Sequence, residues 1–167
     1  MYEKIVVPLD GSKLAECVFP YVEGLAQGCG TKEVILISVT EPVIGRTRAP
    51  EAQEVFRTGE EARVGKSGSV VTLTLGKKER QAQRYLDRVA KRLQKKEIGV
   101  RIKVLLGKPA EEIVSFSEEN GGDLIIMASH GRSGPSRWAY GSVAEKVFRA
   151  SCVPVMMIKA PGCLPGF

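Results

Sequence analysis

The sequence has few of the residues on which zinc sites and nucleophilic catalysis usually depend. Among its 167 residues there is one histidine, His130, and there are four cysteines, which show no C-x-x-C spacing. A zinc site would have to be assembled from scattered residues, so we expect no structural metal. A catalytic triad would have to use His130, and no G-x-S-x-G motif accompanies it, which argues against hydrolase chemistry of that kind.

The chain also lacks a long hydrophobic run. No apolar stretch approaches the length of about 18 residues that a membrane-spanning helix needs. The first residues, MYEKIVVPLD, do not have the basic and apolar regions of a secretion signal. We therefore predict a cytoplasmic protein without a membrane span. The apolar content of 43% and the charged content of 26% are typical of one globular domain, which we assign to residues 1–160, with a tail at 161–167.

What the sequence does contain is an alternation of apolar and amphipathic segments. Short apolar runs predict strands at 5–9, 34–39, 100–106, 124–127 and 153–158. Helical patterns lie between them, at 12–28, 79–98, 109–119 and 142–150. We expect Pro20 to kink the first helix, and Phe148 and Cys152 to lie in the core. The alternation predicts an α/β fold with a parallel sheet and right-handed crossovers.

Residues 40–78 interrupt this alternation. They show no clear helical core pattern and contain seven prolines and glycines. The segment is too long for an ordinary connection, so we interpret it as an insertion that acts as a lid, as a partner-binding segment or as a mobile loop.

The helix predicted at 79–98 has a strongly basic face. Arg80, Arg84, Arg88, Arg92 and Lys96 recur at intervals of four. Residues 77–103 hold eleven basic and three acidic residues, and their local net charge of +8 exceeds the net charge of +6 of the whole chain. The pattern is compatible with a surface that binds a polyanion or an acidic partner. We favour a solvated helix face, because no interleaved aromatic residues accompany the charge, and we do not expect nucleic-acid binding.

The most informative stretch is 123–142, which passes from a buried strand through a glycine-containing loop to a helix. The loop provides turn residues and free backbone amides, and the spacing of Ser142 and Glu145 predicts a capping box at the helix start. A strand, a loop and a helix N-terminus in this order form an anion site, for which phosphate is the usual ligand. A loop that serves only turn geometry remains the alternative.

The motifs in and around this loop resemble the ATP-binding branch of the universal stress protein family. The loop reads Ala128-x-x-Gly131, then nine residues, then Gly141-Ser142, against G-2x-G-9x-G-S/T in the family, so that Ala128 replaces the first glycine. The opening KIVVPLDGS (4–12), the segment GKPAEEIV (107–114) and the ending 141–159 also match. The resemblance covers nearly the whole chain, and it implies a five-stranded sheet of order 3-2-1-4-5, an open sheet of the Rossmann-like or flavodoxin-like kind.

The resemblance also implies a ligand site at the carboxyl ends of the first and fourth strands. Pro8, Leu9 and Asp10 would line the adenosine pocket, with Val39 and Met127 packed on the adenine. The loop from Ala128 and His130 through Gly131, Arg132, Ser133 and Gly134 would hold phosphate, and Gly141, Ser142 and Val143 would complete the cradle. A magnesium or manganese ion that bridges the phosphates is compatible with this arrangement, although the sequence places no carboxylate beside them. The implied assembly is a homodimer that pairs through strand 153–158.

Three functions follow from these observations. The first, which we favour, is binding of ATP as a regulatory or sensing ligand in a stress response. The second is a slow ATPase or autophosphorylating enzyme assisted by His130 or Asp10; the sequence shows no general base that would face the terminal phosphate. The third is a nucleotide-free dimeric module that binds a protein partner through the basic helix or the insertion.

Overall fold

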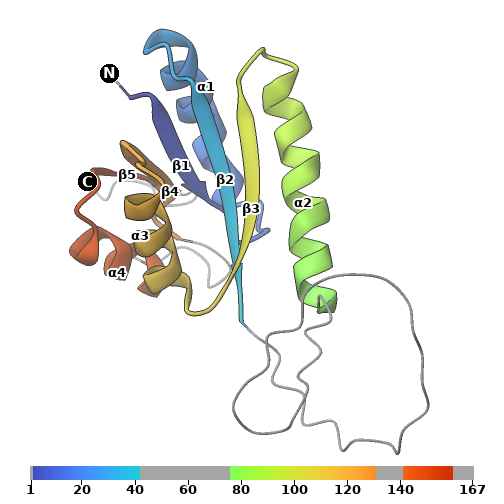
Figure 1. Cartoon of the computed structure of the whole chain (residues 1–167), viewed down its shortest axis with the longest axis vertical. Coiled ribbons are helices and arrows are strands. Elements are labelled where there is room, and N and C mark those ends of the chain that lie inside the picture. The colour runs from blue at the N-terminus through green and yellow to red at the C-terminus, as the bar shows by residue number, and fades with distance from the viewer. Residues whose placement is uncertain (1, 42–75, 131–140, 160–167) are drawn as a thin grey trace, which may run out of the picture.

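The fold is a five-stranded parallel sheet with helices on both faces (Figure 1). The computed structural model describes residues 2–41, 76–130 and 141–159. The strands are β1 (Lys4–Pro8), β2 (Glu33–Thr40), β3 (Val100–Leu106), β4 (Leu124–Ala128) and β5 (Val155–Ile158). They are all paired in parallel in the order β3-β2-β1-β4-β5. The order 3-2-1-4-5 and the α/β class expected from the sequence are thus confirmed.

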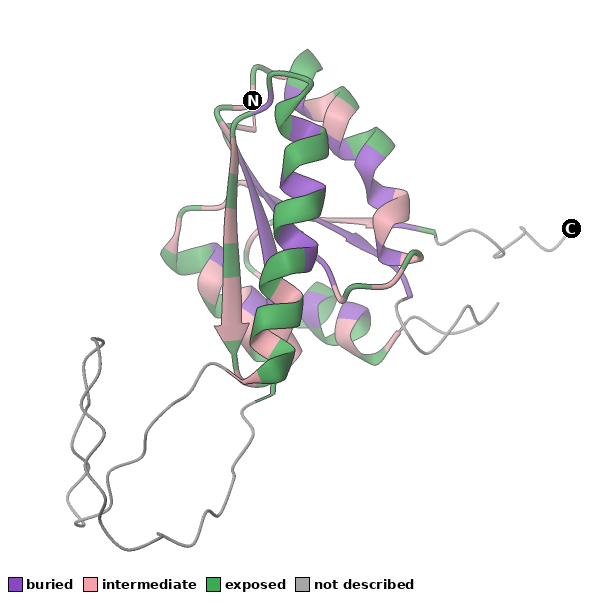
Figure 2. Cartoon of the chain, turned by 90° about the vertical axis from the view of Figure 1, so that its right-hand side faces the viewer, coloured by how far each residue is buried: buried purple, intermediate pink, exposed green. Residues whose placement is uncertain are grey.

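Helices cover both faces of the sheet, and the longest helix lies on one of them. One face is packed by a short 3-10 helix, η1 (Ala15–Val18), by α1 (Phe19–Gly28) and by the longest helix, α2 (Lys77–Gln94). The other face is packed by α3 (Pro109–Glu119) and α4 (Ser142–Ala150). Figure 2 shows the burial along α1 and α2, where exposed and buried positions alternate at helical spacing.

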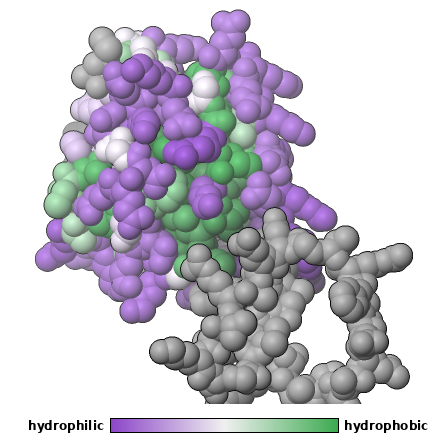
Figure 3. Space-filling model, viewed as in Figure 1, coloured by the Kyte–Doolittle hydropathy of each residue, from purple (hydrophilic) through white to green (hydrophobic). Residues whose placement is uncertain are grey.

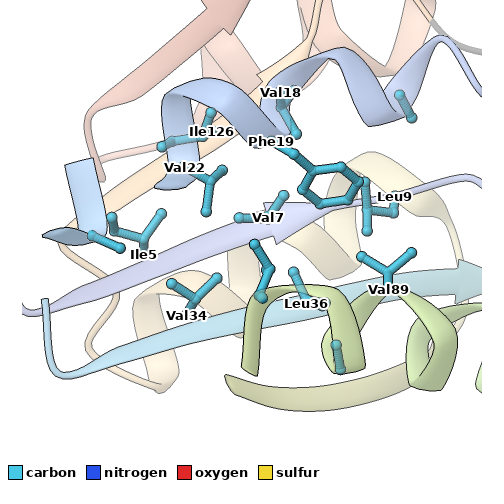
Figure 4. Packing of buried hydrophobic residues seen from close by; sticks show 14 of the residues in the cluster. Ile5, Val7, Leu9, Val18, Phe19, Val22, Val34, Leu36, Val89 and Ile126 are labelled. Atoms are coloured by element: carbon cyan, nitrogen blue, oxygen red, sulfur yellow. The ribbon is translucent and has the colours of Figure 1, made fainter. Parts of the chain in front are cut away.

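The core follows from the alternation of side chains along the buried strands. Ile5 and Val7 of β1 point to the η1, α1 and α2 face, whereas Val6 between them points to the α3 and α4 face. Figure 4 shows the first of these clusters, in which Phe19 and Val22 pack down onto β1. Because β1, β2 and β4 are buried on both faces, they read in the sequence as continuous apolar runs.

Three local predictions, those for Pro20, Phe148 and Cys152, are wrong. Pro20 does not kink a long helix, because the segment divides into η1 and α1 and Pro20 lies in the first turn of α1, where its missing amide costs no hydrogen bond. Phe148 is 56% exposed, since α4 turns the side of Ala144 and Val147 to the sheet, and Cys152, which follows α4, is also exposed.

The insertion predicted at 40–78 falls almost wholly outside the described residues. Its predicted ends overlap regular structure, because β2 continues through Thr40 and α2 begins at Lys77. The described α2 is also shifted towards the N-terminus relative to the prediction of 79–98. Gly76 caps it, and the Glu79 carboxylate accepts a hydrogen bond from the Gly76 amide at 3.0 Å.

The basic face of α2 is partly occupied by acidic residues of its neighbours. Arg92 pairs with Glu16 at 3.3 Å, Arg88 reaches the same carboxylate at 4.0 Å, and Lys96 pairs with Glu23. Ion pairs of such exposed side chains contribute about 0–1 kcal/mol each. This part of the predicted basic stripe is therefore a contact between α2 and η1 or α1. The described part of the face shown in Figure 3 is mainly hydrophilic, with apolar surface gathered near the middle of the view.

Candidate functional site

The fold creates a cavity where the strand order reverses. The chain proceeds outward from β1 to β2 and β3, and then crosses to β4 on the other side of β1. Open parallel sheets bind ligands at the carboxyl ends of the strands that flank such a point. A cavity of about 750 Å³ lies there, which is within the range of small-molecule sites, about 300–1,000 Å³.

The structure brings together every predicted site residue that it describes. They line the cavity from β1, β2, β4 and α4 and from the residues next to these elements: Pro8, Leu9, Asp10, Val39, Met127, Ala128, His130, Gly141, Ser142 and Val143. The remaining four, Gly131, Arg132, Ser133 and Gly134, lie outside the described residues.

Asp10 lies directly after β1 and organises the turn that follows it. Its Oδ1 accepts a hydrogen bond from the Ser12 amide at 2.9 Å, and the Ser12 hydroxyl accepts one from the Ala15 amide at 3.1 Å. This turn role is compatible with the ligand role that the family resemblance implies for Asp10, because the half-buried residue also lines the cavity. The local turn holds it at the strand end.

The start of α4 differs from the predicted capping box. Gly141 is the N-cap residue and Ser142 is already the first helical residue, so the serine hydroxyl does not cap the helix. The first hydrogen bond of the helix runs from the Glu145 amide to the Gly141 carbonyl at 3.0 Å. The amides of Ser142, Val143 and Ala144 belong to the first turn, where amides have no hydrogen-bond acceptors within the helix. All three residues line the cavity.

Gly141 is held close to the end of β4. Its amide donates to the Ser129 carbonyl at 2.8 Å, and a Cβ at this position would lie 3.2 Å from the same oxygen. Its φ of −59° is open to any residue, so the requirement for glycine is one of space. The absence of a side chain keeps the first turn of α4 accessible from the cavity.

The end of β4 continues into a buried pair of polar side chains. Ser129 and His130 are 2% and 6% exposed, and the serine Oγ lies 3.1 Å from the histidine Nδ1. The Ser129 amide donates to the Ile158 carbonyl at 2.7 Å, which ties this segment to β5. His130, the one histidine of the chain, is thus a cavity-wall residue with its ring fixed by a neighbour.

Helix α2 forms a wall of the cavity that sequence reasoning did not assign to the site. Lys78, Gln81, Ala82 and Tyr85 line the cavity from one face of the helix. The sequence pattern places Ala82 and Tyr85 on the buried side of this helix, which is correct. Spacing along α2 was the available signal, but it does not show that this face of the helix, which packs against β2 and β3, also lines the cavity.

The Tyr85 hydroxyl is the one buried side-chain polar atom without a hydrogen-bond partner among the described residues. Burial raises the pKa of this hydroxyl above its ordinary value, and the negative charges of Glu16 and Asp10 raise it further. The Glu16 carboxylate approaches the hydroxyl without reaching hydrogen-bond geometry. The cavity wall at Tyr85 therefore carries a buried, un-ionised phenol.

The described residues do not form a metal site of their own. Within the described ranges no three histidine, cysteine or acidic side chains group closely enough to hold an ion. The described acidic residues that line the cavity are Asp10 and Glu41. No described helix is long and apolar enough to cross a membrane.

Comparison with known proteins identifies the family. The model of the universal stress protein family matches residues 1–159. The chain belongs to the universal stress protein family. It is 32% identical to universal stress protein MJ0577 of Methanocaldococcus jannaschii over 164 residues, which is 95% of this chain and 96% of the relative. It is 30% identical to MJ0531 of the same organism, over 96% of this chain and 84% of the relative.

Solved structures of the family share the fold. The structure of MJ0577 superposes with a TM-score of 0.68 at 25% identity, covering 95% of this chain and 96% of that one. A universal stress protein in complex with cAMP gives a TM-score of 0.63 at 16% identity, covering 95% and 97%. The universal stress protein of Archaeoglobus fulgidus in complex with dAMP gives 0.62 at 21% identity, covering 95% and 98%.

Proposed function

We propose that this universal stress protein binds ATP in the cavity at the ends of β1 and β4. The observation that carries the proposal is the first turn of α4, where three residues whose amides have no helical partners line the same cavity as Asp10. Amides at a helix N-terminus bind phosphate, since they donate hydrogen bonds and carry the positive end of the helix dipole. Two proteins of this fold were solved with the adenine nucleotides cAMP and dAMP, which makes this ligand class the first to test.

The shape of the cavity suggests an orientation for the nucleotide. The phosphates would lie at the first turn of α4, next to the loop that contains Gly131, Arg132, Ser133 and Gly134. The nucleoside would extend towards the end of β2, with its base between Val39 and Met127, which supply apolar surface from two strands. Asp10, between these two ends, would accept hydrogen bonds from the ribose. ATP would bind with or without a magnesium or manganese ion on its phosphates.

The role that we propose is regulatory or sensing, in a cytoplasmic stress response. His130 is the residue of the described wall best suited to general acid–base catalysis, and its Nδ1 is engaged by Ser129. Efficient hydrolysis needs a base positioned on the attacking group. Slow ATP hydrolysis or autophosphorylation is the second candidate, supported by the presence of His130 and Asp10 in the cavity.

We further propose that two copies pair through the edge strand β5. Its other edge is bonded to β4, and Val155, Met156 and Met157 are only half-buried in the single chain. Pairing of two such edges would satisfy the outward backbone groups and cover these side chains.

Isothermal titration calorimetry on nucleotide-free protein, with and without magnesium, tests ATP binding. The parent should bind near the micromolar range, about −8 kcal/mol. In Gly141→Val the added side chain presses on the Ser129 carbonyl and fills the phosphate end of the cavity. We expect a loss of affinity of at least about 100-fold, or about 2.7 kcal/mol.

Gly24→Val is the matched control, because a Cβ at Gly24 in α1 meets no atom within 4 Å. This variant should bind ATP like the parent, and thermal unfolding should show that both variants are folded. Folded parent protein that binds no ATP would overturn the proposal. Equal ATP affinity of the parent and Gly141→Val would contradict the proposed position of the phosphates at the start of α4.

A further inference from the structure

The cavity has a polar wall on α2 that the phosphate site does not use. Lys78 and Gln81 are exposed, Ala82 is half-buried and Tyr85 is buried, so the face passes from the rim of the cavity to its interior. The spacing of three, one and three residues places these side chains on one side of the helix. The α2 wall, defined by these four residues, has to recognise whatever part of a ligand lies against it.

The α2 wall lies across the sheet from the start of α4. Helix α2 packs against β2 and β3 and belongs to the core on one face, whereas α4 packs with α3 and β5 on the other face. Figure 1 shows the two helices on different sides of the sheet. A nucleotide whose phosphates lie at α4 therefore directs its other end, the base, towards the end of β2 and the α2 wall. This step rests on the proposed function.

Gln81 is the side chain at this end of the cavity that can both donate and accept hydrogen bonds through adjacent atoms. It is the only amide side chain among the described residues that line the cavity. The Lys78 ammonium only donates, the Glu41 carboxylate only accepts, and the Thr40 hydroxyl already bonds to the Leu105 carbonyl. Adenine presents its 6-amino donor beside a ring-nitrogen acceptor, and a glutamine amide matches this pair with two hydrogen bonds.

We propose that Gln81 determines the base specificity of the nucleotide site. Its Oε1 accepts a hydrogen bond from the 6-amino group of adenine, and its Nε2 donates to the neighbouring ring nitrogen. A site that hydrogen-bonds a ligand group discriminates against an analogue that lacks the group, because the partner is then left unpaired. Gln81 is thus a specificity-determining residue supplied by a helix outside the strand-end loops.

The test compares ATP with purine riboside triphosphate, which carries hydrogen in place of the 6-amino group. This analogue is sharper than inosine triphosphate, because a rotated amide would match the 6-oxo group of inosine. Calorimetry should show that the parent binds ATP about tenfold more tightly than the analogue, a difference of about 1.4 kcal/mol. In Gln81→Met, which keeps the length of the side chain, ATP affinity should fall by at least about tenfold. Affinity for the analogue should fall less, because the analogue loses only the bond to its ring nitrogen, and the preference for ATP should disappear.

Gln83→Met is the matched control, because Gln83 is exposed on the same helix and does not line the cavity. It should keep the parental preference for ATP. The inference is overturned if Gln81→Met keeps the full preference, or if the parent binds both triphosphates equally well. Those outcomes leave ATP binding itself intact, whereas a parent that binds neither compound overturns the proposed function as well.

Discussion

Replacing Ala128 by glycine separates the structural role of this position from its role in the site. The family motif has glycine here, at the last residue of β4. Among the described non-glycine residues only Glu97 has a positive φ, so Ala128 keeps an ordinary strand conformation. Its side chain is 8% exposed and belongs to the core cluster that contains Leu9 and Ile158. The alanine methyl therefore contributes to packing, and the backbone does not require glycine.

The expected cost of Ala128→Gly has two parts. Glycine in a strand loses about 0.5–1 kcal/mol in conformational entropy relative to alanine. Loss of one buried methyl group removes about 0.8 kcal/mol of hydrophobic stabilisation. The free energy of unfolding should fall by about 1.5 kcal/mol, which for a chain of this length lowers the melting temperature by about 3–6 °C.

Urea unfolding and calorimetry with ATP together test this reasoning. Affinity for ATP should stay within about twofold of the parent, because the strand conformation and the α4 amides are unchanged. An increase of about fivefold or more, which is about 1 kcal/mol, would show that the methyl group occupies space that the ligand needs. Unchanged stability would refute the packing role of Ala128.

Two further predictions concern Tyr85 and the edge of β5. Tyr85→Phe should raise the free energy of unfolding near neutral pH by about 1 kcal/mol, because it removes a buried hydroxyl without a partner. Since the pKa of Tyr85 is raised in the folded state, the unfolded chain releases this proton first as the pH rises above about 10. Above this pH the free energy of unfolding of the parent should therefore fall more steeply than that of Tyr85→Phe. Urea unfolding at several pH values up to about 11 measures both slopes, and equal slopes would contradict the prediction. On β5, the carbonyls of Pro154 and Ile158 accept from amides of the β4 segment at 2.9 and 2.7 Å, so the peptide groups of Met157 face away from the sheet. Met157→Pro should then yield monomers in sedimentation while Met157→Ala stays dimeric; a dimeric Met157→Pro would exclude this edge as the interface.

Strands β1, β2 and β4 were predictable because burial on both faces leaves continuous apolar runs. The run 100–106 and the helix 142–150 coincide with β3 and α4 in both bounds. Pro20 was misread because a proline inside a periodic pattern has the same appearance whether it kinks a helix or begins one. Phe148 was misplaced because its apolar character was taken to mean burial, although α4 has only one side against the sheet.

The candidate site was predictable where its residues stand at strand ends. Asp10, Val39 and Ala128 follow or end apolar runs, so a parallel sheet brings them to one edge whatever the details of packing. Gln81 has no such marker, because its place in the cavity wall depends on how α2 packs against β2 and β3. Motifs in loops therefore indicate the proposed phosphate end of this site, whereas a helix surface contributes to the end at which we propose that the base binds. If Gln81 selects the base, relatives with the same loop and a different residue at this position of α2 should hold the phosphates alike and differ in the base they prefer.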